Sequence, residues 1–471
     1  MDDSSMKYKL SIMIFRRDLR IIDNTALIHA MGKSKKVLPI FILSTKQVTN
    51  QNKYRSSNSI QFMIESLRDL DNQIKDAGGA GLTVMFGDEI DMIDDLKNQI
   101  DIDAIFVNED YSPYARSRDK KIQSYCKKNK IKFESYHDIL LIDDMESVCA
   151  QNGNYYKNFT MFYKRAVQND IRKIDKDIRT NFYKKILGMN VDNADKSILN
   201  EKCYTINENL AVRGGRIEAL RLLKSLKGFN KYNQFRDYPS RNTTMLSAHN
   251  KFGTVSIREV HKVFSRYTQD LVKQLYWRDF YYYVCYHYPE LFNYVHLHKS
   301  YTNRVKWSDN YKYFKKWKKG ETGFPIVDAA MREMNTTGYM HNRCRMIVAM
   351  FLTKDLFINW KYGEKYFTKM LVDIDRCQNL GNWNWCASFG LDNASYVRIF
   401  NPWTQSHDYD KDCKYIKRWL PELVDVPNDH IHKWFKYYKD HSDIDYPAPI
   451  IDHDHGRKQF MNFYSKGLVS N

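Results

Sequence analysis

The segment DIDRCQNLGNWNWCASFG (373–390) concentrates side chains suited to a buried ligand or redox site. It carries two acids, one neutral amide and two indoles, namely Asp373, Asp375, Asn379, Trp383 and Trp385. Carboxylates can pair with cations, whereas a neutral amide forms hydrogen bonds without adding charge. The segment begins like a calcium loop, but cysteine and glutamine occupy the third-ligand and glycine positions and no glutamate occupies the twelfth. We therefore exclude an EF-hand.

A second candidate site is the run QLYWRDF (274–280). Its spacing places Gln274 and Arg278 on one helical face, with Trp277 beside them. A buried amide, a flat ring and a guanidinium could together bind a base and its phosphate. A core tryptophan next to a surface arginine would give the same pattern, so both interpretations stay open.

Two arginines, Arg343 and Arg345, lie near the expected start of a helix in HNRCRM (341–346). At a helix start they could hold a phosphate. They could also pair with acids, for which Asp373 and Asp375 are the candidates. This motif alone does not decide between the two roles.

Two other regions invite functional interpretations that the sequence does not favour. Cations alternate with rings in YTNRVKWSDNYKYFKKWKKG (301–320), which suits phosphates and stacked bases but equally suits a helix with buried rings and solvated lysines. Four histidines near the carboxyl end could bind a metal, namely His430, His432, His453 and His455. They lack an HExxH motif and cysteine partners, so we expect solvated surface histidines and no metal.

The composition indicates a large globular protein with an anionic partner. The chain has 471 residues, of which 43% are hydrophobic and 14% aromatic, and this predicts two or more domains. A formal charge of +18 favours nucleic acid as the partner, although a general lysine bias would give the same excess. The cysteines form no CxxC pair, and the sequence has neither a signal-peptide core nor an apolar run of about 18 residues. We therefore expect a soluble intracellular protein.

The elements that must position these residues fall into three regions. Strand-like apolar runs separated by segments with helical spacing predict an α/β domain with a parallel sheet over residues 1–140; the runs are LSIMIF, VLPIFIL, LTVMF and AIFVNED. A polar stretch over 141–205 is interpreted as an interdomain connector. Helical periods from GGRIEALRLL onward, including HNRCRMIVAMFLTKDLFINW, predict a larger all-α domain over 206–471. AGGAG (77–81) precedes a strand, so we expect a turn there and not a phosphate-binding loop.

Taken together, the motifs resemble those of the photolyase and cryptochrome flavoproteins over nearly the whole chain. FRRDLRIIDN (15–24) is similar to that family's amino-terminal signature, with Phe15 where tryptophan is usual. Eight further blocks follow in the family's order: RDYP, TTMLS, LYWRDF, TGFPIVDAAMREM, GYMHNRCRM, DIDRCQN, GNWNWCAS and RIFNP. The resemblance implies a Rossmann-like amino-terminal domain and a helical domain that holds FAD in a folded, U-shaped conformation.

The resemblance also implies which residues contact FAD. They are Tyr232, Thr243, Thr244, Met245, Leu246, Ser247, Asn342, Arg345, Asp373, Ile374, Asp375 and Asn379. Met245 stands where arginine is usual. Because a buried acid must be paired, we expect Arg345 to bind Asp373, while Asp375 accepts a hydrogen bond from a flavin NH or hydroxyl group. Asn379 is expected to face flavin N5, where a neutral amide that can donate avoids like-charge repulsion with the reduced flavin.

Three indoles match the family's electron-transfer tryptophans, which run from the flavin toward the surface: Trp383, Trp360 and Trp307. Without the resemblance, ordinary core packing would explain them. The other residues expected to take part in catalysis are Asn379, Gln274, Trp277 and Met346. The residues expected to contact DNA are Arg236, Gln274, Trp277, Arg278, Asn342, Arg343, Arg398 and Gln405.

The expected activity is photolyase repair of cyclobutane pyrimidine dimers, in which light-excited reduced FAD lends an electron to a flipped-out dimer. Photolyases for six-four photoproducts carry two proton-transferring histidines where this chain has Asn342 and Met346. Cyclobutane-dimer enzymes usually carry glutamate at the position of Gln274. Glutamine can donate a hydrogen bond but cannot supply a proton, so we expect repair with reduced efficiency.

Alternative functions remain open. A cryptochrome light receptor, including a DASH-type protein that prefers single strands, gains support from Gln274. It loses support because the chain ends soon after PAPIIDHDHGRKQF and because Asn379 is not the aspartate of plant receptors. A six-four photolyase would need the missing histidines. A non-photochemical nucleotide-binding enzyme would be colourless, so an absorption spectrum would separate it from the flavoproteins.

A second, antenna chromophore is undecided. YSPYARSRD (111–119) aligns with the region where some relatives bind a folate, but Ala115 replaces the glutamate that contacts the pterin. This disfavours folate and leaves a deazaflavin or no antenna. We expect a monomer, as is usual in the family.

Overall fold

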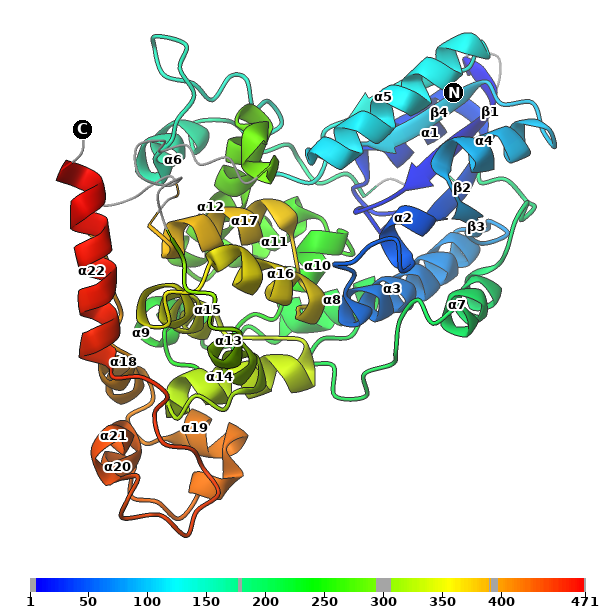
Figure 1. Ribbon diagram of the computed structural model, residues 1–471. Coiled ribbons are helices and arrows are strands. Elements are labelled where there is room, and N and C mark those ends of the chain that lie inside the picture. Colours follow the sequence, from blue (N-terminus) through cyan, green and yellow to red (C-terminus); the bar gives the residue numbers. More distant parts are fainter. Residues whose placement is uncertain (1–5, 177–179, 294–305, 389, 391–396, 470–471) are drawn as a thin grey trace.

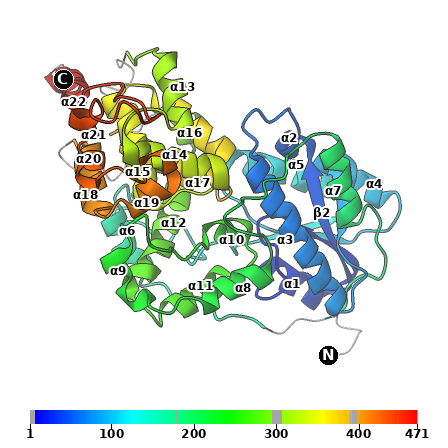
Figure 2. The same ribbon diagram turned by 90° about the horizontal axis from the view of Figure 1, so that it is seen from below.

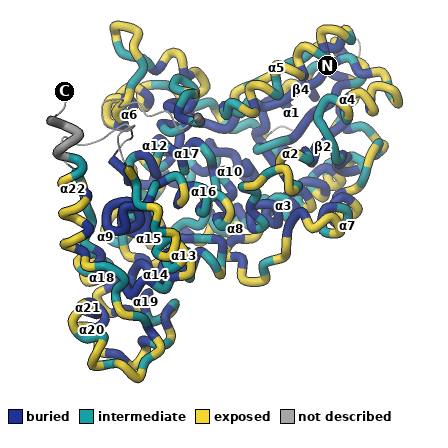
Figure 3. Tube along the Cα trace, viewed as in Figure 1, coloured by how far each residue is buried: buried dark blue, intermediate teal, exposed yellow. Residues whose placement is uncertain are grey.

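The computed structural model describes residues 6–176, 180–293, 306–388, 390 and 397–469. It consists of an α/β domain, at the upper right of Figure 1, and a larger helical domain beside it. Buried residues concentrate in the middle of each domain and exposed residues at its periphery (Figure 3). The predicted order, with a Rossmann-like domain followed by a helical domain, is therefore confirmed.

The α/β domain is built on a five-stranded parallel sheet with strand order β3-β2-β1-β4-β5. The strands are β1 (Tyr8–Phe15), β2 (Ser34–Ser44), β3 (Thr83–Gly87), β4 (Ala104–Asn108) and β5 (Lys132–Tyr136). The four predicted strands are confirmed, whereas β5 was missed. Its sequence, KFESY, is polar and partly exposed because it forms an edge of the sheet. AGGAG forms the expected turn between α3 and β3, with Gly78 in the left-handed region (φ 78°).

Helices cover both faces of the sheet, as a parallel sheet requires. Met13 and Phe15 of β1 pack on one face with α1 (Thr25–Lys33) and α3 (Ser57–Asp76). The alternate residues Ile12 and Ile14 pack on the other face with α4 and α5. These two helices span Glu89–Lys97 and Pro113–Lys128, and the short α2 spans Thr45–Val48.

The stretch 141–205, predicted as a connector, contains two helices that pack on different domains. Helix α6 (Phe159–Ala166) contacts α12 (Gln269–His287) of the helical domain. Helix α7 (Val191–Asn200) contacts α3 and β3 of the α/β domain. The stretch thus contributes to both cores, while boundaries at residues 140 and 205 stay a prediction.

The helical domain is built around several long helices. It ends in the outer helix α22, which is red in Figure 1 and is seen from below in Figure 2. Its remaining helices are α8 (Arg216–Lys224), α9 (Tyr232–Phe235), α10 (Ser247–Phe252), α11 (Ile257–Phe264), α13 (Tyr311–Lys319), α14 (Pro325–Thr337), α15 (Asn342–Met350), α16 (Trp360–Met370), α17 (Arg376–Cys386), α18 (Pro402–Tyr409), α19 (Lys414–Trp419), α20 (Asn428–His432), α21 (Trp434–Tyr437) and α22 (His453–Val469). Short 3-10 turns span Phe229–Lys231, Pro289–Asn293 and Pro421–Leu423.

The helical period over HNRCRMIVAMFLTKDLFINW does not correspond to one continuous helix. After α15 the chain forms a π-helical turn, Phe351–Asp355, and then leaves the helix before α16 begins. Phe357 adopts a left-handed conformation (φ 53°), and its carbonyl accepts a hydrogen bond from Ser308 N at 2.8 Å. The apolar spacing persists through the break, which is why periodicity alone did not reveal it.

The lysine-rich helix α13 has the pattern of a helix with buried rings and solvated lysines, the second of the two interpretations of its sequence. Its Trp317 is buried and donates to the carbonyl of Val348 at 3.1 Å. Lys312, Lys315 and Lys319 are exposed on the opposite side. Residues 301–305 of this segment, including Arg304, lie outside the described residues.

Four buried charged residues join the two domains. Arg258 of α11 binds Asp23 at 2.7 Å and Asp138 at 2.8 Å, and Arg20 binds Asp138 at 2.6 Å. All four side chains are at most 2% exposed. Burial alone would raise the pKa of Asp138, but the charges of Arg20 and Arg258 hold it below its usual range. The helical domain is thus fixed to the α/β domain by a paired ionic cluster.

Within the described ranges, no helix is both long and apolar enough to cross a membrane.

Candidate active site

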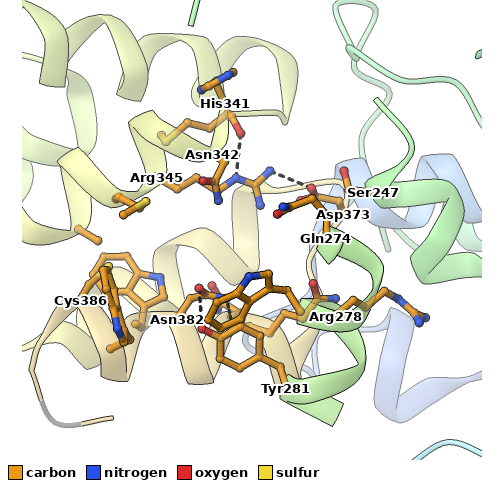
Figure 4. A pocket seen from close by; sticks show the side chains of 18 of the residues that line it. Ser247, Gln274, Arg278, Tyr281, His341, Asn342, Arg345, Asp373, Asn382 and Cys386 are labelled. Carbon is orange, nitrogen blue, oxygen red and sulfur yellow. Dashed lines mark hydrogen bonds and ion pairs between the residues drawn. The ribbon is translucent and has the colours of Figure 1, made fainter. Parts of the chain in front are cut away.

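A cavity of about 680 Å³ opens within the helical domain (Figure 4). Its walls come from α9, the loop before α10, and helices α12, α15 and α17. This volume lies within the range of ligand and cofactor pockets. All twelve residues assigned to FAD by resemblance line it: Tyr232, Thr243, Thr244, Met245, Leu246, Ser247, Asn342, Arg345, Asp373, Ile374, Asp375 and Asn379.

The loop before α10 bends sharply at Met245, whose φ of 54° lies in the left-handed region. This conformation is uncommon for a residue with a side chain and costs about 1–2 kcal/mol. Thr243 Oγ1 lies 2.8 Å from the hydroxyl of Tyr339 and so fixes the start of the loop against the opposite wall. The bend keeps the loop along the cavity.

The predicted pair of Arg345 and Asp373 is confirmed. Arg345 Nη2 donates to Asp373 Oδ2 at 2.8 Å, and its Nε donates to the carbonyl of Met340 at 2.8 Å. Burial would raise the pKa of Asp373, but the charge of Arg345 lowers it below its usual range. Asp373 Oδ1 is buried and lacks a partner of good hydrogen-bond geometry among the described residues, although the Ser247 hydroxyl beside the carboxylate also lowers its pKa. It therefore offers a ligand NH or hydroxyl group an acceptor.

Asp375 has a different environment from the one expected. Its Oδ2 accepts from Arg17 and from the hydroxyl of Tyr282, and its Oδ1 accepts from the backbone N of Gln378 at 3.1 Å. Burial would raise the pKa of Asp375, but the charge of Arg17 and the Tyr282 hydrogen bond lower it to about 2. Asp375 still lines the cavity, and a carboxylate can accept a further hydrogen bond, so its role as the flavin's acceptor stays a prediction.

Asn379 is oriented by α16. Its Nδ2 donates to Glu364 Oε1 at 2.9 Å and lies 3.2 Å from both the Glu364 carbonyl and Thr368 Oγ1. Because carboxylate and carbonyl oxygens only accept, the NH₂ group must face Glu364. The carbonyl oxygen is therefore the amide group left for a ligand in the cavity, whereas the sequence predicted a donor, and the contact with flavin N5 stays a prediction.

The residues expected at the lesion, Gln274, Trp277 and Met346, also line the cavity. Gln274 Nε2 donates to the carbonyl of Asp270 at 3.0 Å. The indole of Trp277 stacks on Phe159 with ring centroids 3.5 Å apart and planes 7° apart. One face of Trp277 is thus covered by α6. The role of Phe159 was missed because it lies in the stretch interpreted as a connector, although the rings of NFTMFYKR mark it as a packed segment.

The three tryptophans of the expected electron-transfer route lie on adjoining elements. Trp383 lines the cavity, and a Cβ added to Gly363 of α16 would lie 2.2 Å from its ring. Trp360 begins α16 one turn before Gly363 and is 1% exposed. Half-buried Trp307 precedes Ser308, which forms a β-bridge with Ile358 just before α16. Trp360 and Trp307 do not line the cavity, and the route stays a prediction.

The residues expected to bind DNA separate into two groups. Six of them line the cavity, namely Arg236, Gln274, Trp277, Arg278, Asn342 and Arg398, and of these arginines Arg236 and Arg398 are exposed. Arg343 and Gln405 lie outside the lining. Arg343 is paired with Asp237 at 2.9 Å and lies 4.3 Å from the ring of Tyr409. The first group is therefore better placed to meet a ligand entering the cavity.

Arg278 also lines the cavity, but it is buried where Arg236 and Arg398 are exposed. Its side chain is 6% exposed, and its Nη1 and Nη2 donate to the carbonyls of Ile139 and Asn250 at 2.6 and 3.2 Å. In Figure 4 its guanidinium points away from the other labelled side chains. In this conformation Arg278 fixes α12 to neighbouring segments. Its Nε has no hydrogen-bond partner among the described residues and the residue lines the cavity, so its contact with DNA stays a prediction.

Lys354 was not anticipated from the sequence, because it lies in an apolar run. It projects from the π-helical turn, and its Nζ donates to Ser388 Oγ at 2.6 Å and to the carbonyl of Arg398 at 2.7 Å. All three residues line the cavity. Burial lowers the pKa of Lys354 to about 7. A single ammonium group thus connects two segments of the cavity wall.

The expectation of solvated histidines is wrong at two of the four positions. His453 is buried and paired with Asp355, and His432 is buried with its Nδ1 2.8 Å from Ser406 Oγ. Within the part of the chain that the structure describes, no three His, Cys, Asp or Glu side chains are grouped as a metal site would require.

Known proteins share these features over the length of the chain. Residues 11–177 match the DNA photolyase family model, and residues 271–466 match the FAD binding domain of DNA photolyase. A deoxyribodipyrimidine photo-lyase of Buchnera aphidicola is 33% identical over 98% of this chain and 97% of the relative. The deoxyribodipyrimidine photo-lyase of Escherichia coli is 32% identical over 96% of this chain and 97% of the relative.

Solved structures agree. A Sulfolobus tokodaii photolyase, described with two FAD molecules, superposes with a TM-score of 0.86 and 39% identity over 97% of this chain and 100% of its own. A class III photolyase from Agrobacterium tumefaciens superposes with a TM-score of 0.88 and 30% identity over 99% of each chain. A cryptochrome of Synechocystis shares the fold: it superposes with a TM-score of 0.84 and 24% identity over 98% of this chain and 100% of its own. With both family models matched in order and the expected flavin contacts gathered around one cavity, the chain belongs to the DNA photolyase family.

Proposed function

We propose that this protein is a light-driven deoxyribodipyrimidine photo-lyase that repairs cyclobutane pyrimidine dimers in DNA with FAD bound in the 680 Å³ cavity. The observation that carries the proposal is the composition of this cavity. One part offers acceptors for a flavin, and the other offers an indole and neutral side chains for a damaged base. Full-length relatives carry the same activity in their names.

The residues present fit FAD. Buried Asp373 Oδ1 and Asn250 Oδ1 lack partners of good hydrogen-bond geometry among the described residues, and both residues line the cavity. They can accept from the NH and hydroxyl groups of the cofactor, while the loop from Thr243 to Ser247 can hold its diphosphate. When bound, FAD supplies a blue-light-absorbing one-electron donor. The carbonyl oxygen of Asn379, fixed by Glu364, can accept from a flavin NH without adding charge.

The cavity favours a cyclobutane dimer over a six-four photoproduct. Asn342 and Met346 stand four residues apart on α15 and both line the cavity, so one helical face presents an amide and a thioether. Neither group can act as a proton shuttle. Trp277 offers a flat surface for a flipped base, and flipping costs a few kcal/mol, least for a damaged pair.

Arg236 and Arg398 hold the phosphates that flank the lesion. Their exposure beside the cavity and the net charge of +18 support this assignment.

The route by which the flavin is reduced is formed by Trp383, Trp360 and Trp307. The protein acts as a monomer. Its antenna site, if it is used, takes a flavin-like chromophore, as the second FAD of the Sulfolobus tokodaii relative indicates, in preference to a folate.

Repair of a defined duplex tests the proposal. The purified holoprotein, chemically reduced, is mixed with a duplex that contains one thymine dimer and is exposed to blue light. We expect loss of the dimer in the light and none in the dark, with no repair of a matched duplex that carries a six-four photoproduct. Unchanged dimers in the light would refute the proposed activity. Repair of single strands alone would instead indicate a DASH-type protein.

A further inference from the structure

We infer that Arg17, which belongs to the α/β domain and lies outside the cavity lining, is a positioning residue for the flavin site. By pairing with Asp375 it removes a net negative charge from the cavity and raises the midpoint potential of the bound flavin. The inference rests on the proposed binding of FAD in this cavity. It assigns the α/β domain a direct part in flavin redox chemistry.

Arg17 reaches the helical domain from the end of β1. Its Nη2 forms an ion pair with Asp375, and its Nε donates to the carbonyl of Lys251 at 3.1 Å. Its Nη1 lies 3.5 Å from Asp110, which follows β4. The Asp375 side chain is 2% exposed and that of Arg17 is 20% exposed. The cation is thus held from both domains, and its main partner is almost completely buried.

The charge of Arg17 has no equivalent among the other contacts of Asp375. Tyr282 donates its hydroxyl to the same carboxylate, and burial raises the pKa of Tyr282 well above its usual range, so it stays a neutral donor. The remaining contact is the backbone N of Gln378. Neutral donors solvate a carboxylate but do not cancel its charge. Among the described residues in contact with Asp375, only the guanidinium does so.

Asp375 connects this pair to the cavity. It caps α17, the helix that carries Asn379 and Trp383, and all three residues line the cavity. The other two acids that line the cavity are paired as well, Asp373 with Arg345 and Asp237 with Arg343. With all three lining acids paired, a reduced, electron-rich flavin meets no uncompensated carboxylate in the cavity lining. An unpaired Asp375 would oppose reduction, because like charges in a buried site interact strongly.

Redox titration of the holoprotein tests the inference. In Arg17→Gln the flavin should become harder to reduce: at a fixed solution potential the reduced-to-oxidised ratio falls at least tenfold, or about 30 mV for a two-electron couple. Asp375→Asn should shift the potential in the opposite direction, because it removes a negative charge from the cavity while Arg17 keeps its positive charge. Adding Arg17→Gln to Asp375→Asn should reverse that rise and return the potential toward the wild-type value.

The matched control is the adjacent Arg16→Gln. Arg16 is also largely buried, but it pairs with Asp119 inside the α/β domain at 2.8 Å. Its replacement should leave the potential unchanged. If Arg17→Gln does not fold, Arg17→Lys, which keeps the charge, should preserve the potential, while the rise in Asp375→Asn still tests the electrostatic effect.

The outcomes separate this inference from the proposed function. Holoprotein that binds FAD but repairs no dimer would refute the photo-lyase activity and leave the redox titration valid. An Arg17→Gln holoprotein with the wild-type potential, or Asp375→Asn without a rise, would overturn the role of Arg17 alone. Failure of the wild-type protein to bind FAD would overturn both.

Discussion

Glu364 Oε1 accepts a hydrogen bond from Asn379 Nδ2 at 2.9 Å, and this contact determines which end of the amide faces the cavity. Glu364 is 1% exposed and lies on α16, whereas Asn379 lies on α17. A residue outside the cavity lining thus sets the hydrogen-bonding character of a residue inside it. The orientation follows from chemistry, because a carboxylate cannot donate to the amide.

Glu364→Leu should therefore impair the reaction more than its effect on folding would explain. Without the carboxylate, only the longer 3.2 Å contacts to the backbone carbonyl of residue 364 and to Thr368 Oγ1 hold the NH₂ group, so the amide can rotate and turn this group toward the flavin. We expect at least a tenfold lower repair rate in single-turnover measurements and altered flavin absorption bands. Glu364→Gln is the matched control, because its side-chain oxygen can still accept, and it should lose no more than a few-fold. Equal rates for the two variants would contradict the role of Glu364.

Arg258→Met should destabilise the whole protein by about 3–5 kcal/mol, the usual cost of removing one partner from a buried ion pair. It leaves Asp23 and Asp138 buried with one fewer cation. Chemical denaturation followed by circular dichroism measures the loss. Arg221→Met is a control, because that arginine pairs with Glu218 on the surface of α8 and should change stability by less than about 1 kcal/mol. Similar losses for the two variants would contradict the structural role of the ionic cluster.

Lys354→Met should change how stability depends on pH. The pKa of Lys354 is lowered by burial to about 7, against about 10.4 in an unfolded chain. Between these values the unfolded state binds more protons, so this group makes stability rise with pH, by at most about 1.4 kcal/mol per unit. The variant should lack this rise. Denaturant midpoints of both proteins from pH 6.5 to 9.5 test it, and parallel curves would refute it.

Much of the cavity was predictable because its residues lie in compact motifs. The segment DIDRCQN supplied Asp373 and its expected partner Arg345, and a buried acid requires such a partner wherever the chain folds. The parallel sheet could also be predicted, because four of its strands are apolar runs. Edge strand β5 was not, because KFESY lacks the buried alternation that marks a strand.

The contacts that the sequence did not reveal join residues far apart in the chain. Arg17 and Asp375 are 358 positions apart, and no local pattern links an arginine after the first strand to a helix cap in the other domain. The buried position of Arg278 was missed for a related reason. Its helical spacing beside Gln274 is real, but the neighbouring carbonyl of Ile139 comes from another segment and turns the guanidinium inward. Tertiary partners decide such orientations, and spacing along one helix cannot.

Gln274→Glu should raise the rate of dimer repair several-fold. Gln274 donates one of its two amide N–H groups to the carbonyl of Asp270, so one is left for a dimer, and neither can be transferred as a proton. A glutamic acid in the same place could supply a proton during ring splitting and would make the rate depend on pH. Single-turnover repair from pH 5.5 to 8.5 measures both effects. A slower variant with a flat pH profile would show that the amide is the better group here.

Arg398→Gln and Arg236→Gln should weaken binding of damaged DNA and each reduce the slope of log Kd against log salt by about one unit, because each removes one phosphate contact. Both arginines are exposed at the cavity. Arg278→Gln should leave that slope unchanged and instead lower stability, since its guanidinium is buried against Ile139 and Asn250. Fluorescence anisotropy with a dimer-containing duplex at several salt concentrations separates the two effects. A reduced salt slope in Arg278→Gln would mean that its side chain turns outward to meet DNA and that the buried conformation is not the one that binds.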